Sequence, residues 1–221
     1  MKRKRRKGEK QKSGKKRSID SMRVPYWHQT SEASCGPSCL LMIFNYYNPK
    51  YGLSRKKEWE LWRETSLLSW RGTHPYGLTI AALKRGFKVT LIREKKTIWR
   101  DKKFPKNNEP LRQMIKLQEA EAKKLGLVEK INRNIGIDLL KRILEEGNYP
   151  IILMRFIRKN GSLGIGHYSV VLKVERDYVI LHDPYARANR KIPMKTFMKG
   201  WNGIRDYLKT GQNKEVLVIE K

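Results

Sequence analysis

The stretch of residues 35–47 constrains the fold of this chain more than any other. Its apolar residues follow helical spacing and cover a broad surface of the expected helix: Leu40, Leu41, Ile43, Phe44 and Tyr47. Pro37 suits the first turn of a helix, where its missing N–H is not needed, and Ser34 is placed to cap that turn. A helix with so wide an apolar face is buried inside a domain. We therefore expect Cys35 to lie at the start of a central, buried helix.

The rest of the sequence predicts helices first and strands later. Ser54 is expected to cap a helix over 54–64, with Trp59 and Trp62 three residues apart on it. Further helices are expected over 78–85, 109–125, 137–146 and 194–199, strands over 87–92, 150–157, 167–174, 178–183 and 215–219, and loops over 70–77 and 93–108. This order favours an α+β domain, with helices packed on an antiparallel sheet, over a doubly wound α/β sheet.

The charge of the chain is strongly positive, at +29 for 221 residues. Residues 1–17 contain eleven Lys or Arg and one acid, Glu9, and almost no apolar side chains. Such a segment cannot bury enough surface to offset its ordering entropy, so we expect a disordered basic tail over 1–22. The domain is expected to span 23–221, with a charged helical insertion at 93–130. The basic tail favours nonspecific contact with nucleic acid, without base recognition.

The two cysteines, Cys35 and Cys39, lie four residues apart. One helix would hold both with diverging side chains, so a disulfide between them is not expected. The N-terminus carries charge where a signal peptide needs its apolar stretch, and no apolar run has the length that a bilayer requires. The sequence therefore predicts a soluble, cytoplasmic protein without a membrane span, in a compartment that keeps thiols reduced.

Cys35 is the candidate nucleophile. The start of a helix presents unpaired N–H groups and a partial positive charge, both of which lower the pKa of a thiol. A histidine that accepts the thiol proton completes the activation. His167, at the start of an expected strand, is the candidate base, and Asp183 ends the next expected strand. If the two share a face of the sheet, the carboxylate can hold the second nitrogen of the imidazole.

The oxyanion of an acyl transfer needs hydrogen-bond donors. The backbone N–H of Cys35 is one, and the side-chain amide of Gln29 is the candidate for the other. We expect no catalytic role for the remaining cysteine and histidines. Cys39 is expected in the core, and His182 on the opposite face of its strand from Asp183. His28 and His74 are expected to be exposed loop residues. A zinc site from Cys35, Cys39 and a histidine lacks the paired spacing of known sites. We expect no metal and no cofactor.

Several blocks of the sequence resemble the C39-like cysteine peptidases of the papain superfamily. The blocks are 24–29 (VPYWHQ), 34–38 (SCGPS), 77–87, 136–150, 166–171 (GHYSVV) and 181–184 (LHDP). They follow the family's chain order and cover about residues 24–219. The resemblance implies a papain-like fold, in which a helix carrying Cys35 packs on an antiparallel sheet carrying His167 and Asp183. It also implies that Gln29, six residues before the cysteine, supplies the oxyanion-hole amide.

Three functions remain compatible with the sequence. The first is a cysteine peptidase, or another amide-cleaving acyl-transfer enzyme, that acts on a peptide or protein substrate. The second is a basic, nucleic-acid-associated protein that uses a papain-like scaffold, for which the net charge is the motive. The third is transpeptidation or deamidation on the same fold, because the choice depends on which nucleophile reaches the acyl-enzyme.

Overall fold

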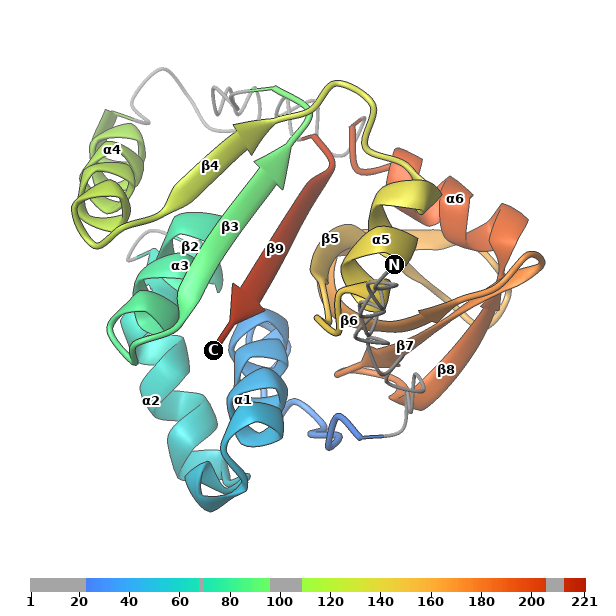
Figure 1. Ribbon diagram of the computed structural model, residues 1–221, viewed down its shortest axis with the longest axis horizontal. Helices are drawn as coiled ribbons and strands as arrows, with labels where there is room; N and C mark the ends of the chain where they lie inside the picture. Colours follow the sequence, from blue (N-terminus) through green and yellow to red (C-terminus); the bar gives the residue numbers. More distant parts are fainter. Residues whose placement is uncertain (1–22, 68–69, 96–108, 206–212) are drawn as a thin grey trace, which may run out of the picture.

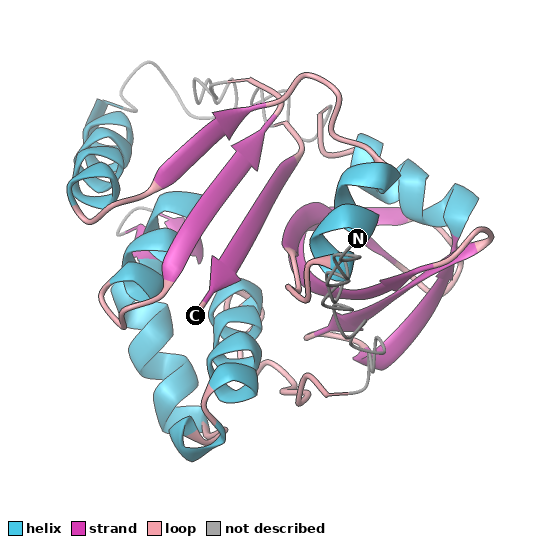
Figure 2. Cartoon of the chain, in the orientation of Figure 1, coloured by secondary structure: helices cyan, strands magenta, loops and turns pink. Residues whose placement is uncertain are grey.

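The computed structural model describes residues 23–67, 70–95, 109–205 and 213–221. The expected basic tail over 1–22 and most of the expected loop over 93–108 lie outside these ranges. In the described part of the chain, helices and strands build an α+β domain around one large sheet (Figures 1 and 2). No helix in this part is both long enough and apolar enough to cross a membrane.

The large sheet has seven strands within the described ranges. Their spatial order is β4 (Val128–Ile131), β3 (Lys88–Arg93), β9 (Glu215–Glu220), β5 (Ile151–Ile157), β6 (Leu163–Val174), β7 (Tyr178–Asp183) and β8 (Arg187–Pro193). All neighbouring pairs are antiparallel except β3 and β4, which run parallel. The strand expected to close the chain, β9, lies in the middle of the sheet and joins β3 to the β5–β8 meander (Figure 1).

The helices gather in two groups (Figure 2). They are α1 (Cys35–Tyr47), α2 (Arg55–Thr65), α3 (Pro75–Leu83), α4 (Glu109–Lys124), α5 (Ile137–Glu145) and α6 (Met194–Asn202). Helix α1 is buried as expected, packs against β6, α2 and α3, and contributes Leu40, Leu41 and Phe44 to the core. Helix α6 packs against β5, β7 and β8, and α5 against β6. The central helix therefore meets the strand that carries His167.

Helix α2 begins where the sequence predicted, and its buried face carries a glutamate. Ser54 caps it, with its hydroxyl accepting a hydrogen bond from the Lys57 N–H at 3.4 Å. The buried residues are Glu58, Leu61 and Thr65, whereas Trp59 is 51% exposed. A glutamate thus occupies a core-facing position of this helix.

The loop expected over 70–77 is wrong. Residues Trp70–Thr73 form β2, which pairs with β1 (Ser66–Leu67), and α3 already begins at Pro75. His74 caps α3, because its ring Nδ1 accepts from the Tyr76 N–H at 3.3 Å. The early helix start agrees with the preference of proline for the first helical position.

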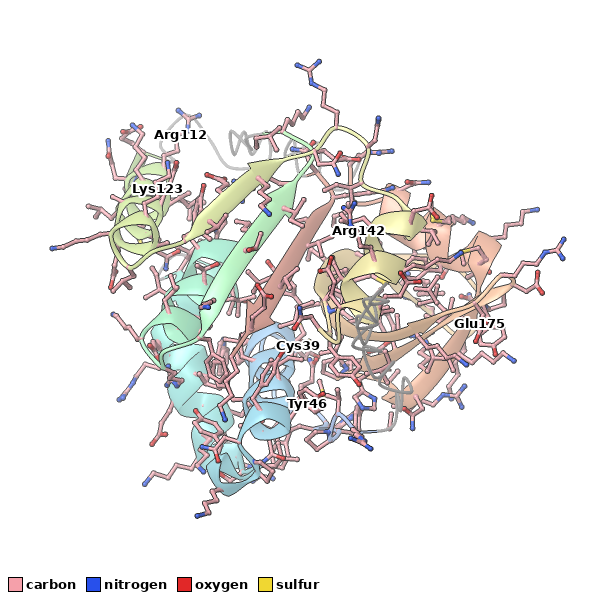
Figure 3. The ribbon with its side chains drawn as sticks, viewed as in Figure 1. Cys39, Tyr46, Arg112, Lys123, Arg142 and Glu175 are labelled. Carbon is pink, nitrogen blue, oxygen red and sulfur yellow. The ribbon has the colours of Figure 1, made fainter. Side chains whose placement is uncertain are left out.

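The predicted helix over 109–125 is present as α4, and the strand that follows it was missed. Leu111, Ile115 and Ala122 are its buried residues, while Arg112 and Lys123 are exposed (Figure 3). The missed strand, β4, is short and mostly exposed, and it forms one edge of the sheet. The other edge, β8, was missed as well, because its sequence, RANRKIP, is mostly polar and shows no apolar alternation.

Candidate active site

Cys35 is the first residue of α1, as the sequence predicted, and it is partly exposed. Gly36 allows the start of this helix to approach β2 closely. A Cβ at that position would lie 2.4 Å from Oγ1 of Thr73, so any larger residue would push the helix start away. Ser34 does not cap the helix with its side chain, contrary to expectation: its hydroxyl accepts from the Ser31 N–H at 3.2 Å and donates to Glu58 at 2.6 Å.

His167 and Asp183 lie on the neighbouring strands β6 and β7. The strands pair Val170 with His182, and one further step of this register sets Ser169 beside Asp183. His167 is therefore the diagonal neighbour of Asp183 on the same face, within reach of a side-chain contact. Its Nε2 lies 2.8 Å from Oδ1 of Asp183, and both side chains are buried.

Asp183 is held by groups besides His167. Its Oδ1 also accepts hydrogen bonds from the backbone N–H groups of Tyr185 and Ala186, both at 3.1 Å. Its Oδ2 is ion-paired with Arg190, whose guanidinium also donates to the carbonyl of Ile157. Every partner stabilises the carboxylate form and fixes its orientation, so the imidazole of His167 meets a rigid acceptor.

The ionisation of Cys35 and His167 is coupled. Burial alone would raise the pKa of the Cys35 thiol, but the hydrogen bond and charge of His167 outweigh burial and lower it, with help from the backbone N–H groups of Tyr168 and Gly36. Burial would lower the pKa of His167, but the hydrogen bonds to Asp183 and Cys35 raise it to about 9. Both shifts favour a thiolate beside an imidazolium.

The pKa of the Asp183 carboxyl is shifted as well. Burial works to raise the pKa of its carboxyl, and the hydrogen bonds and charges of His167 and Arg190 outweigh burial and lower it. Because Nε2 of His167 faces this carboxylate, Nδ1 is the ring nitrogen left for the sulfur of Cys35. The three side chains can thus share one proton between sulfur and imidazole while the carboxylate stays charged.

Gln29 is buried at 5% exposure beside this group. Its backbone N–H donates to the carbonyl of Pro184, the residue after Asp183, at 2.9 Å. Its side-chain Nε2 donates to the carbonyl of Ser31 at 2.7 Å, which uses one of the two N–H bonds of the amide. The second N–H remains available to a ligand, and Oε1 is buried without a hydrogen-bond partner.

The comparison with family models decides the family of this chain. The model described as the Peptidase_C39 like family matches residues 24–198. The chain belongs to this family. The match contains all four residues of the candidate site: Gln29, Cys35, His167 and Asp183.

A solved C39-type structure shares the fold of this family member. A Bacillus anthracis protein described as a C39-like peptidase superimposes with a TM-score of 0.50 at 14% identity, covering 92% of this chain and 97% of that one. A double-glycine-motif protease from an AMS/PCAT transporter, solved with a leader peptide, gives a TM-score of 0.49 at 16% identity, covering 89% of this chain and 91% of that one. No curated protein matches the sequence. The predicted papain-like α+β fold is confirmed.

The other cysteine and histidines of this C39-like chain have structural surroundings. Cys39 lies on α1 (Figure 3), is fully buried, and burial raises the pKa of its thiol far above the ordinary value. Nε2 of His182 lies 2.8 Å from the carbonyl of Val24, and Nδ1 accepts from the Asn189 N–H at 3.1 Å. His28 is exposed, as expected.

The expectation for His74 is wrong, because this residue is only 2% exposed. Burial first, and then the charge of Arg93, lower the pKa of its imidazole to about 3. Its ring stays neutral and caps α3. In the described ranges, no group of three His, Cys, Asp or Glu side chains could hold a metal ion.

Sequence reasoning missed two residues of the site, Arg190 and Glu58. Arg190 lies on the unpredicted strand β8, so nothing placed it beside Asp183. Glu58 lies in a charged stretch, RKKEWELWRE, that reads as a solvated helix face. A signal was available for Glu58, because it stands three residues before Leu61 and seven before Thr65, on the buried stripe of α2.

Proposed function

We propose that this protein is a cysteine peptidase that cleaves an amide bond of a peptide or protein, with Cys35, His167 and Asp183 as its triad. One observation carries the proposal. His167 hydrogen-bonds Asp183 at 2.8 Å, and it lies close enough to Cys35, at the start of α1, to lower the pKa of that thiol against the effect of burial. This is the arrangement that activates a thiol for acyl transfer.

The reaction follows from these positions. The thiolate of Cys35 attacks the carbonyl carbon of the substrate, and the oxygen becomes an oxyanion that accepts from the Cys35 backbone N–H and the free N–H of Gln29. Cleavage of the C–N bond expels the amine, which takes the proton of the His167 imidazolium. Water, deprotonated by His167, then releases the acyl group and restores the thiol.

Asp183 keeps its charge throughout this cycle. It holds Nε2 of His167 at 2.8 Å, so Nδ1 stays directed at the sulfur. Its carboxylate also stabilises the imidazolium, and Arg190 together with two backbone N–H groups prevents it from rotating away. An amine in place of water at the last step would give transpeptidation from the same acyl-enzyme.

The state of the thiols supports a reducing compartment, such as the cytoplasm, as the place of action. Both cysteines of the chain are free. A thiolate that is partly exposed and paired with an imidazolium oxidises readily, so the enzyme needs a reducing environment to stay active.

The first test is labelling with iodoacetamide at neutral pH, read by mass spectrometry of the whole protein. The wild type should take up one label at Cys35, and Cys35→Ala should take up none, since Cys39 is buried with a raised pKa. Equal labelling of the two proteins excludes Cys35 as the reactive thiol. A peptide library then tests the activity, because an acyl-enzyme trapped on Cys35 identifies the substrate.

A further inference from the structure

Glu58 is a fully buried carboxylate, at 0% exposure, on α2. Its oxygens accept five hydrogen bonds. The donors are Trp27 Nε1 at 2.8 Å, the Thr30 N–H at 2.8 Å, Thr30 Oγ1 at 2.9 Å, Ser34 Oγ at 2.6 Å and Ser38 Oγ at 3.2 Å. All five are neutral, and four come from residues 27–34. Buried carboxylates are costly and normally pair with a cation, so this set of partners needs an explanation.

The direction of two of these hydrogen bonds is fixed by chemistry. Trp27 Nε1 and the Thr30 backbone nitrogen can only donate. The Thr30 hydroxyl accepts from Trp59 Nε1 at 2.9 Å, so its own hydrogen is free to point at Glu58. The Thr30 N–H meets Oε1 and Trp27 meets Oε2, which means that both oxygens of Glu58 must accept.

These contacts surround the two donors expected for the oxyanion. Gln29 lies between Trp27 and Thr30, both of which donate to Glu58. Cys35 lies between Ser34 and Ser38, whose hydroxyls also donate to Glu58. The loop is tied internally as well, because the Ser34 N–H donates to the Ser31 carbonyl at 3.3 Å, and Gln29 Nε2 donates to that same carbonyl. The segments that carry Gln29 and Cys35 are therefore both tied to one carboxylate.

We propose that Glu58 is a positioning residue for the oxyanion hole: it gathers the donors of residues 27–34 and so holds Gln29 and the Cys35 N–H at the spacing that the tetrahedral intermediate requires. This inference rests on the proposed peptidase function and adds a residue to it. Glu58 acts through the loop, and it does not contact His167 or Asp183 in any of its five hydrogen bonds.

Glu58→Gln is the sharpest variant because it keeps the size of the side chain. An amide has one acceptor oxygen and one NH₂ donor. If the NH₂ group takes the position of Oε2, it faces the indole N–H of Trp27. If it takes the position of Oε1, it faces the backbone N–H of Thr30. Either orientation sets two donors against each other, so the loop must move. Glu60→Gln is the matched control, since Glu60 is an exposed glutamate on the same helix.

Two probes separate the oxyanion hole from the thiolate. Iodoacetamide alkylates the thiolate by forming an S–C bond as iodide leaves, and no oxyanion develops. p-Nitrophenyl acetate acylates the sulfur through a tetrahedral oxyanion and releases p-nitrophenolate, which is measured by its absorbance. Both rates are taken as the difference between each protein and its Cys35→Ala form. Misplacement of the oxyanion donors should lower the second rate alone.

The expected result for Glu58→Gln is an acylation rate lower by at least about tenfold, with the alkylation rate within about threefold of wild type. Glu60→Gln should leave both rates unchanged. Loss of both reactions in equal measure, or retention of both, overturns the positioning role. Failure of the proposed function looks different, because the wild type itself would then be acylated no faster than its Cys35→Ala form.

Thr30→Val tests the positioning role of Glu58 if Glu58→Gln does not fold, as judged by circular dichroism. Thr30 is exposed and valine has its shape, but the variant loses the hydroxyl that links Trp59 to Glu58. The backbone N–H of residue 30 still reaches Glu58, so a smaller effect is expected, about threefold on acylation. An unchanged acylation rate, or an equal fall in alkylation, contradicts the proposal.

Discussion

The two buried carboxylates beside Cys35 are held in opposite ways. Asp183, on β7, has two cationic partners, His167 and Arg190, and two backbone N–H groups. Glu58, on α2, has five neutral donors, most of them from the loop before Cys35. One carboxylate lies on the sheet side of the site and the other on the helix side.

This difference separates two tasks within one site. A carboxylate among cations controls where protons reside, since its charge stabilises the imidazolium and thereby the thiolate. A carboxylate among neutral donors has no proton to control on its partners, and it fixes positions instead. Exchange of either acid for its amide should therefore damage different steps, and the four predictions below test that division.

Asp183→Asn should have the largest effect. The amide keeps the shape of the side chain but loses the charge that raises the pKa of His167, and in either orientation its NH₂ group faces another donor, Arg190 or the N–H of Tyr185. We expect acylation by p-nitrophenyl acetate at pH 7 to fall by about a thousandfold or more. Alkylation by iodoacetamide should fall too, because the thiolate loses its imidazolium partner.

Asp177→Asn is the control for this variant, since Asp177 is an exposed aspartate in the turn between β6 and β7. It should leave both rates at the wild-type level. If Asp183→Asn lowered acylation alone, as expected for Glu58→Gln, the two carboxylates would share one task. The assignment of different tasks to Asp183 and Glu58 would then be wrong.

Arg190→Met should have the second largest effect, on stability. The substitution leaves the buried carboxylate of Asp183 without its ion-pair partner and should lower the free energy of unfolding by about 3 kcal/mol at pH 7. The loss should shrink in acid, because burial works to raise the pKa of Asp183 while Arg190 and His167 lower it below 3.8. Such a group stabilises the fold above its unfolded pKa and loses that effect as the pH falls through its folded pKa.

Urea denaturation measures this difference, with Arg187→Met as the reference. Arg187 is an exposed arginine on the same strand, β8, and its removal should change the free energy of unfolding by no more than about 0.5 kcal/mol. An equal loss in the two variants would mean that Arg190 does not support Asp183.

The pH dependence of alkylation gives a third prediction of intermediate size. In the wild type the pKa of Cys35 is lowered from 9.0, so its thiolate reacts below that pH while His167, with a pKa of about 9, stays protonated. Asp183→Asn should raise the midpoint of the rate profile by about one pH unit, since the imidazolium becomes less stable. Glu58→Gln should leave the midpoint in place. A shift in both variants would contradict separate tasks.

Asp183 and Glu58 also show how much of the candidate site could be predicted from the sequence. Asp183 was predicted because two expected strands joined by a short hairpin can bring it near His167, and because residues 181–184 resemble the strand that ends in the family's aspartate. Glu58 was missed because its surroundings are distant in the chain. It contacts residues 20–31 positions away, in α1 and in the segment before it, and only tertiary packing creates those contacts.

The face of α2 illustrates the physical reason. Trp59 is one of the large apolar residues of α2, but it is 51% exposed and its indole N–H donates to Thr30. The core side instead carries Glu58, whose desolvation is offset by hydrogen bonds that no periodicity can reveal. The edge strands β4 and β8 were missed for a related reason, since exposed edges lack an apolar alternation.

Ser38→Ala should have the smallest effect and locates the action of Glu58 most closely. Ser38 is buried inside α1 and donates to Oε1 of Glu58 at 3.2 Å, the longest of the five hydrogen bonds. Its removal should lower the free energy of unfolding by about 1 kcal/mol in urea denaturation. The acylation rate should stay within about twofold of wild type, because the four remaining donors belong to residues 27–34 and still hold the loop. A tenfold fall in acylation would mean that Glu58 acts by orienting the start of α1, and the loop would then lose its central part in the oxyanion hole.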